Sequence, residues 1–368
     1  MTSGIAKWVL RAAGCLGLVS AVCLAMPVAV RAADDAEPFF ASLESLSPAD
    51  REAKLLEGAK KEGSVVWYTT DSPQSTQIMV KAFMKKYPSV KAEYIRGKSR
   101  EIADRIMTEA RSGRNLFDIA KTSTETVDVY PEGTFATYKS PVMDDLPATM
   151  KGKNWASIFT FVRALGYNSN MLKPADLPKT WEDLLDPKWK GKILFDESSV
   201  PEVNALYARL GKDKASDYLD RLGSSGNLRI LTGRNTISQM LTAGEAPLAV
   251  TVYPYDVESL KRKGAPIDWA LLDINPGLLQ PLSIARKPAH PYAAALMYDY
   301  LLSKEGQEVY AEMGRTPANP KAAVKNEREK AAVQDPRVIF ENLEGGGAPF
   351  EVTTQMLDEK ILKRSLQR

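Results

Sequence analysis

Two tyrosines separated by one proline are the residues of this sequence best suited to hold a ligand. Tyr253 ends the strand-like run Pro247–Tyr253, and Tyr255 follows two positions later. If the backbone stays extended there, both phenols project to one side, because strand side chains alternate between the two faces. Two converging phenols could ligate a hard, highly charged cation or hydrogen-bond an anion. The alternative is that the two rings simply pack at the edge of a domain.

Hydroxyl-bearing and polar side chains gather in four loops, each of which follows an expected strand. The loops are Thr69-Thr70-Asp71-Ser72, Thr122-Ser123-Thr124, Ser198-Ser199 and Gly233-Arg234-Asn235-Thr236. In open α/β sheets a ligand lies at this carboxyl edge, beside helix N-termini whose free N–H groups favour anions. The same residue types are also good helix N-caps, so each loop alone has a structural explanation. Together with the tyrosines, the predicted ligand-binding residues are Thr69, Thr70, Asp71, Ser123, Ser198 and Arg234, and Arg163 is a further candidate anion partner.

The sequence carries no catalytic motif that we recognise. Its single histidine, His290, precedes Pro291 at an expected helix start, where capping or surface exposure is the favoured role. Nucleophile-elbow, phosphate-loop, dinucleotide and zinc-protease patterns are all missing from the sequence. We therefore predict a protein that binds its ligand and is not an enzyme.

Alternating strands and helices must position these loops. Val65–Thr70, Lys91–Ile95 and Leu116–Ala120 are predicted strands with amphipathic helices between them, a pattern typical of a parallel sheet. A second set of strands is predicted at Lys192–Asp196, Leu228–Leu231 and Pro247–Tyr253. Two runs, Phe159–Tyr167 and Pro281–Arg286, are predicted to cross between the two units. The expected fold class is therefore α/β with two lobes, each a central sheet flanked by helices, and a cleft between them.

The first 33 residues predict export from the cytoplasm. Lys7 and Arg11 precede the apolar run Ala12–Val30, and small residues up to Ala33 form a cleavage-like site. An uncleaved membrane anchor is the alternative interpretation. We expect a cleaved signal peptide and a periplasmic location.

The composition changes once this leader is set aside. The leader contains both cysteines and three of the 49 basic residues, whereas the 46 acidic residues all follow it. The remaining chain is formally neutral, which makes nucleic acid a poor partner. It also lacks thiols, which excludes disulfides and cysteine metal sites there.

Several stretches between Lys61 and Lys321 carry a family resemblance. They are Lys61–Thr70, Thr108–Gly113, Phe117–Ile119, Thr180–Lys192, Gly264–Trp269 and Leu301–Gln307. In this order they resemble the periplasmic solute-binding proteins of bacterial ABC importers, in the branch that includes the ferric-iron-binding proteins. The resemblance implies a type II fold whose two lobes are joined by two strands, shut on a ligand and dock on an inner-membrane permease.

The resemblance also implies a choice of ligand. In iron-binding members, neighbouring tyrosines of the second lobe ligate ferric iron, often with a histidine and an acid of the first lobe. Here Pro254 separates the tyrosines, and the loop around Asp71 has no histidine. The implied metal ligands are Tyr253, Tyr255 and Asp71, with Fe³⁺ and a synergistic anion as cargo and no resident cofactor. A small oxyanion or organic acid, held by hydroxyls, helix N-termini and Arg234, is the other candidate.

The expected organisation follows from this resemblance. Residues 1–33 form the signal peptide, 34–160 the first part of lobe 1, 161–284 lobe 2, and 285–368 the return to lobe 1 with C-terminal helices. We expect a monomer that captures a small molecule or metal ion and delivers it to an ABC permease. The alternative is a soluble sensor that presents its closed form to a membrane receptor. The carrier is favoured because no signalling module is appended to the two-lobe body.

Overall fold

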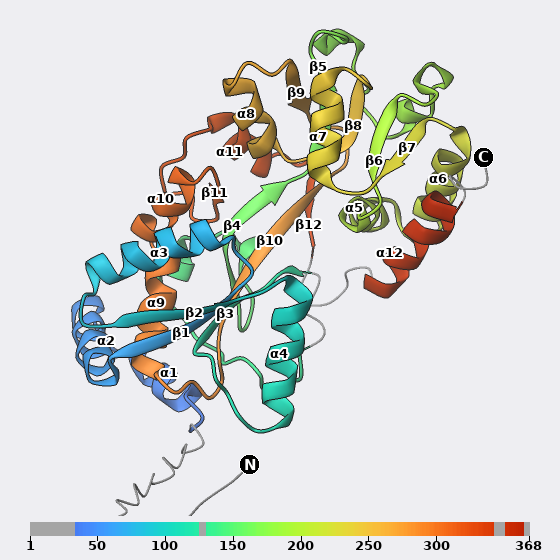
Figure 1. The fold of residues 1–368 in the computed structure, drawn as a ribbon. Helices are drawn as coiled ribbons and strands as arrows, with labels where there is room; N and C mark the ends of the chain where they lie inside the picture. The colour runs from blue at the N-terminus through green and yellow to red at the C-terminus, as the bar shows by residue number, and fades with distance from the viewer. Residues whose placement is uncertain (1–33, 125–129, 342–349, 364–368) are drawn as a thin grey trace, which may run out of the picture. The chain divides into compact units, whose positions relative to one another are not determined.

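The computed structural model describes residues 34–124, 130–341 and 350–363, apart from the side chain of Thr251. The predicted signal peptide and its cleavage site lie outside the described residues. Among the described residues, no helix combines the length and the apolar character that crossing a membrane requires. Two separate sheets, each with its own helices, organise the chain that follows the leader (Figure 1).

The first sheet combines a parallel and an antiparallel part. Its strands are β1 (Ser64–Thr69), β2 (Lys91–Arg96), β3 (Ile119–Lys121), β4 (Ala156–Val162), β10 (Asn275–Ile284), β11 (Thr316–Pro317) and β12 (Val338–Phe340). The order is β11-β4-β10-β3-β1-β2, with β12 paired to β10. β1 runs parallel to both β2 and β3, as the sequence predicts, whereas β10 runs antiparallel to β3 and β4.

Helices cover both faces of the first sheet. They are α1 (Glu37–Leu43), α2 (Pro48–Glu62), α3 (Pro73–Lys86), α4 (Ser99–Arg111), α9 (Pro291–Leu302) and α10 (Lys304–Glu312). α3 shows how the sequence sets such a helix: Ser72 Oγ accepts the Ser75 N–H at 3.2 Å, and Pro73 fits the first turn. Its buried Met79 and Phe83 join the main core. Ile102 and Ile106 of α4 form a second cluster with Tyr68.

The second sheet is also mixed. Its strands, in the spatial order β7-β6-β8-β5-β9, are β5 (Ala164–Asn168), β6 (Ile193–Asp196), β7 (Leu228–Leu231), β8 (Leu248–Val252) and β9 (Ile267–Ala270). The helices around it are α5 (Val200–Leu210), α6 (Lys212–Ser225), α7 (Arg234–Ala243) and α8 (Pro254–Arg262). Glycines in the left-handed conformation end α6 and α7, at Gly226 and Gly244.

Among the described residues, consecutive strands pass from one sheet to the other twice. Arg163 alone separates β4 in the first sheet from β5 in the second. The return crossing lies between β9 and β10, at 271–274, and not at the predicted Pro281–Arg286. Pro281 does not end the strand, because it sits where the register of β10 against β4 shifts and its missing N–H is tolerated.

The C-terminal part divides between the two sheets. α11 (Glu327–Val333) packs against β4 and β11, and α12 (Phe350–Leu357) packs on α5 and α6. The apolar spacing of α12 predicts a buried face, and we expected that face on the first lobe. Met356, Leu357 and Ile361 instead join the core of the second sheet. Periodicity shows that a face is buried, but it does not show what buries it.

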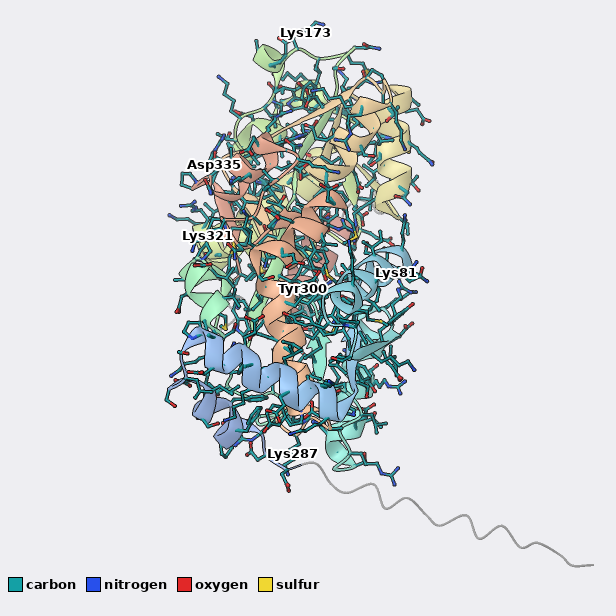
Figure 2. All side chains as sticks on the ribbon, turned by 90° about the vertical axis from the view of Figure 1, so that its left-hand side faces the viewer. Lys81, Lys173, Lys287, Tyr300, Lys321 and Asp335 are labelled. Atoms are coloured by element: carbon teal, nitrogen blue, oxygen red, sulfur yellow. The ribbon has the colours of Figure 1, made fainter. Side chains whose placement is uncertain are left out.

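Short helical turns complete the described structure. They are η2 (Pro141–Asp145), η3 (Ala148–Met150), η4 (Pro174–Asp176), η5 (Glu182–Leu185), η6 (Pro187–Trp189) and the π-helical η7 (Asp358–Leu362). Of the side chains labelled in Figure 2, Lys81, Lys173, Lys287 and Lys321 are exposed, whereas Tyr300 is buried.

His290 connects the starts of β1 and β3 in the first sheet through its two ring nitrogens. Its Nδ1 lies 2.8 Å from Oδ2 of the buried Asp118, and its Nε2 lies 3.2 Å from Ser64 Oγ. The order Ser-His-Asp resembles a nucleophilic triad. However, the N–H groups of Tyr292 and Ala293, which could stabilise an oxyanion at this helix start, both bind the Glu62 carboxylate. The arrangement is structural.

This pair predicts a pH dependence of stability. The hydrogen bond that His290 donates to the Asp118 carboxylate raises the pKa of His290, although burial opposes the rise. A raised pKa means that His290 stabilises the fold fully below its unfolded pKa of about 6.5 and loses this contribution as the pH rises through the folded pKa. We expect His290→Gln to flatten part of the fall in Tm between pH 6 and 8. Identical pH profiles of the variant and the wild-type protein would contradict this role.

Candidate functional site

A buried polar network occupies the carboxyl end of β1 and β3. Lys121 Nζ donates to Thr70 Oγ1 at 2.7 Å and lies 3.1 Å from Asp71 Oδ1. Tyr310 donates its hydroxyl proton to Asp71 Oδ2 at 3.2 Å, and Thr69 Oγ1 accepts the Asp71 N–H. The Lys121 and Asp71 side chains are only 4% and 7% exposed. The Asp71 carboxylate is therefore already compensated by a cation.

The two tyrosines lie at the start of α8 and not in a strand. β8 ends at Val252, Tyr253 is the extended N-cap residue of α8, and Pro254 starts that helix. The premise of one extended strand carrying both tyrosines is wrong, because proline fits the first turn of a helix and begins one here. The rings nevertheless meet, with centroids 5.3 Å apart. Phe161 of β4 joins them, with its centroid 5.6 Å from Tyr253 and 5.2 Å from Tyr255.

Three arginines lie against these rings. The guanidinium carbons of Arg163 and Arg234 are 5.6 and 4.8 Å from the centroid of the Tyr253 ring. That of Arg315 is 4.8 Å from the Tyr255 ring and 5.1 Å from the Phe161 ring. These distances fall in the range of cation–π contacts. We call Phe161, Tyr253, Tyr255, Arg163, Arg234 and Arg315 the aromatic–arginine cluster.

Phe159 connects the cluster to the network around Lys121. Phe159 and Phe161 are two positions apart on β4, which places them on one face, and their centroids are 5.2 Å apart. Lys121 Nζ lies 5.3 Å from the Phe159 ring, and Tyr310 packs on the same ring at 4.8 Å. The structure thus joins the predicted residues Thr70, Asp71, Arg234, Tyr253 and Tyr255 through neighbours from both sheets.

Arg163 also forms the most deeply buried ion pair at the site. Its Nε lies 2.9 Å from Glu202 Oε1, and the two side chains are 2% and 1% exposed. Burial raises the pKa of Glu202, and Arg163 opposes this rise. Because Arg163 is the residue between β4 and β5 and Glu202 belongs to α5, this pair fixes one crossing of the chain to the second sheet.

Burial raises the pKa of Tyr255 in the cluster and of Asp256 beside it. Burial raises the pKa of Tyr255 to about 12, with a further contribution from Asp256. Burial also raises the pKa of Asp256, which Arg315 and Arg234 oppose. Four cations, Lys121, Arg163, Arg234 and Arg315, lie among four carboxyl groups, Asp71, Asp196, Glu202 and Asp256. Lys121 and Arg163 pair with Asp71 and Glu202. Among the described residues, Arg234 and Arg315 have no carboxylate within ion-pair distance, so their guanidinium groups suit a guest that brings negative charge.

The remaining predicted residues have other positions. Ser198 is exposed, and both its N–H and its hydroxyl bind Asp196 Oδ1, at 2.8 and 2.6 Å. Its neighbour Ser199 is fully buried at the N-terminus of α5, and within the described residues its hydroxyl has no hydrogen-bond partner. Ser123 follows β3, two residues beyond Lys121, and its hydroxyl is buried. Ser199 is thus better placed than Ser198 to offer a hydroxyl group.

Sequence reasoning missed Lys121, Phe161 and Arg315. The signal for Lys121 was a charged residue at the end of an otherwise apolar strand, and Arg315 follows the glycine that closes α10. No comparable signal marks Phe161 within an apolar strand. In the described part of the chain, no group of three or more histidine, cysteine, aspartate or glutamate side chains could hold a metal ion.

Comparisons with known proteins place this geometry in context. Residues 128–338 match the family described as bacterial extracellular solute-binding protein. An uncharacterized protein of Haemophilus influenzae is 28% identical over 271 residues, which are 70% of this chain and 78% of that one. The shared family is one of binding proteins, in agreement with the prediction that the chain is not an enzyme.

Two solved structures share the fold. Iron-bound HitA from Pseudomonas aeruginosa has a TM-score of 0.64 at 20% identity, over 83% of this chain and 98% of HitA. The periplasmic binding protein AfuA from Actinobacillus pleuropneumoniae, with fructose-6-phosphate bound, has a TM-score of 0.57 at 21% identity, over 83% and 97%. The predicted α/β fold of the two-lobe periplasmic binding proteins is confirmed.

The buried pair predicts a large effect of removing one partner. Arg163→Met leaves the Glu202 carboxyl buried without its cation, so we expect the free energy of unfolding to fall by about 3–5 kcal/mol. Adding Glu202→Gln should recover part of this loss. Chemical denaturation of both variants measures the effect, with the exposed Arg114→Met as a control within about 0.5 kcal/mol of the wild-type protein. A double variant less stable than Arg163→Met would contradict the pairing.

Proposed function

The chain belongs to the bacterial extracellular solute-binding proteins, and we propose that it captures a small anion for an ABC importer. The cargo is an oxyanion or organic acid, held at the aromatic–arginine cluster and released to an inner-membrane permease. The carrying observation is that three arginines lie against the rings of Phe161, Tyr253 and Tyr255, while Lys121 lies over the neighbouring Phe159 ring. The proposed place of work is the periplasm.

The charges of the site favour an anion over a bare cation. Arg234 is exposed, and Arg315 lines a cavity of about 660 Å³ that also borders Tyr255. Guanidinium groups present donors that match carboxylate and phosphate oxygens. The buried Ser199 hydroxyl and the N-terminus of α5 supply further donors on the side of Glu202. A solute needs no chemical change to use these groups, because they only bind and orient it.

Delivery requires that the bound and free forms differ. Residues of β4, α8 and the segment after α10 meet in the cluster, so a solute bound there contacts both sheets' elements at once. A solute that binds the closed arrangement better than the open one shifts the population toward closure. We propose that the permease reads this closed form. The absence of any need for chemistry at the site fits a carrier.

Ferric iron is the second candidate. The 5.3 Å separation of the Tyr253 and Tyr255 rings favours it, as does the likeness of the fold to iron-bound HitA. Against it, both phenols lie beside arginines, and the pKa of Tyr255 is raised. A trivalent ion ~5 Å from one guanidinium would be opposed by roughly 10 kcal/mol at an effective dielectric constant of about 20. An anionic chelator would have to offset this repulsion.

Thermal shift with a panel of anions tests the main proposal. We expect inorganic phosphate, citrate or fructose 6-phosphate to raise Tm by mass action. A bound anion at a free concentration of 100 times its Kd stabilises the folded state by about 2.7 kcal/mol. Arg234→Gln and Arg315→Gln should each require at least ten times more anion to produce the same shift in Tm, because each variant removes a charged donor. Arg114→Gln, an exposed arginine elsewhere, is the matched control. No shift with any anion at millimolar concentration would refute the proposal.

The tyrosines and iron are tested by colour. If ferric iron is the cargo, ferric citrate should give a visible phenolate-to-metal band that Tyr253→Phe with Tyr255→Phe abolishes. We expect a colourless mixture instead, because the arginines repel the ferric ion and burial raises the pKa of Tyr255. Absorbance between 400 and 600 nm measures the band. A band that is present in the wild-type protein and lost in the double variant would replace the anion by iron.

A further inference from the structure

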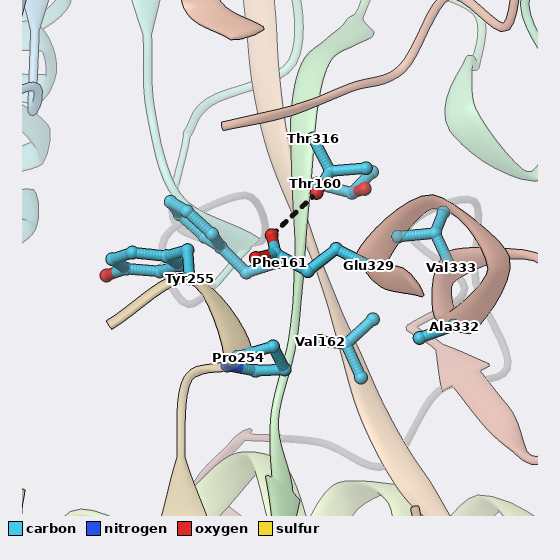
Figure 3. A pocket seen from close by; sticks show the side chains of 9 residues that line it. All are labelled: Thr160, Phe161, Val162, Pro254, Tyr255, Thr316, Glu329, Ala332 and Val333. Carbon is cyan, nitrogen blue, oxygen red and sulfur yellow. Dashed lines mark hydrogen bonds between the residues drawn. The ribbon is translucent and has the colours of Figure 1, made fainter. Parts of the chain in front are cut away.

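Glu329 is a buried carboxyl group that lies next to the proposed site and serves no role described so far. It belongs to α11 and is 9% exposed. Thr316 Oγ1 of β11 donates to its Oε2 at 3.3 Å (Figure 3), and Asn326 Nδ2 donates to its Oε1 at 2.8 Å. Glu329 thus ties α11 to the edge of the first sheet, beside β4.

The partners of Glu329 are neutral. No ion pair within 4 Å involves Glu329 among the described residues, in contrast to Asp71 and Glu202. Burial without a close cation disfavours the ionised form. Accordingly, desolvation raises the pKa of Glu329 to about 7, and the hydrogen bonds from Asn326 and Thr316 only partly oppose this.

Two cavities border the Glu329 side chain. The smaller one, of about 10 Å³, lies between Glu329, Val162, Phe161 and Tyr255, and is lined also by Thr160 (Figure 3). This volume approaches the room that one water molecule needs. Thr160 Oγ1 is fully buried and, within the described residues, has no hydrogen-bond partner, although Thr160 pairs with Thr316 across β4 and β11.

The larger cavity, of about 660 Å³, gives protons a path to Glu329. The titratable and charged groups that face this region come from three segments. From α8 they are Tyr255, Asp256, Glu258 and Arg262. From the segments on either side of β11 they are Glu312, Arg315 and Lys325, and from α11 there is Arg328. Of these, Glu258 opposes ionisation of Glu329 and Arg262 favours it.

We propose that protonated Glu329 holds α11 against the sheet edge formed by β4 and β11, and that ionisation of Glu329 weakens this contact. The same edge carries Phe161 of the aromatic–arginine cluster. The neutral acid keeps α11 seated, and its O–H can serve Thr160 Oγ1 through one water. Loss of that proton to solvent leaves a carboxylate with only neutral partners, which draws water in and loosens the contact. On the proposed function, solute affinity is then greater at acidic than at alkaline pH.

The experiment measures the stability of the protein without solute. A negative result would therefore refute the role of Glu329 and leave the proposed anion binding, which is tested separately, unaffected. We compare wild type, Glu329→Gln and the exposed control Glu327→Gln on the same helix. Because the folded pKa is raised, the wild-type fold loses stability as the pH rises from 5 to 8. Between pH 5 and 8, the unfolding equilibrium constant of the wild-type protein should rise on the order of 100-fold more than that of Glu329→Gln. Glu327→Gln should follow the wild-type protein, and His290 is present in all three.

Hydrogen exchange locates the effect. After correction for intrinsic rates, the amides of 158–162 and of Thr316 should lose at least tenfold protection between pH 6 and 8 in the wild-type protein and in Glu327→Gln. In Glu329→Gln their protection should stay constant. Parallel unfolding profiles of wild type and Glu329→Gln, or equal loss of protection in both, would overturn the proposal.

Discussion

The ion pair between Arg163 and Glu202 is the contact on which the arrangement of the site depends. Arg163 is the single residue between a strand of the first sheet and a strand of the second, and Glu202 belongs to the helix that follows β6. Both side chains are almost fully buried, so each charge relies on the other for compensation. The same guanidinium lies against the Tyr253 ring, which ties the crossing to the ring cluster.

The site combines charges that would be costly if they were separated. Lys121 compensates Asp71, Arg163 compensates Glu202, and Arg234 and Arg315 act on Asp256. Aromatic rings pack beside these groups. On the proposed function, Arg234 and Arg315 favour a guest that adds negative charge, and a guest that adds positive charge must overcome their repulsion.

Glu329 differs from the other buried acids near the site because its partners are neutral. The protein thus contains two kinds of buried carboxyl group. One kind has a lysine or arginine within ion-pair distance, and the other has only neutral hydrogen-bond partners. Glu329, of the second kind, has a pKa raised to about 7 and lies between α11 and the sheet.

The sequence by itself determined the α/β class, the parallel β1–β2–β3 unit and most helix positions. These features depend on local periodicity and on caps such as Ser72 with Pro73, which neighbouring residues settle. The position of the polar loops after β1, β3, β6 and β7 was predictable for the same reason. The sequence also pointed to Tyr253, Tyr255 and Arg234 as neighbours in one site, although the extended backbone assumed for the tyrosines is helical at Tyr255.

Only the tertiary structure decided which groups meet. Arg315 reaches Tyr255 across sixty positions of the chain, Lys121 reaches Asp71 across fifty, and α12 packs on the second sheet. The second crossing at 271–274 also depends on how β10 pairs with β3 and β4. Such contacts follow from packing and from the compensation of buried charge between distant segments. A local pattern shows that a side chain is buried or polar, but its partner is chosen by the fold.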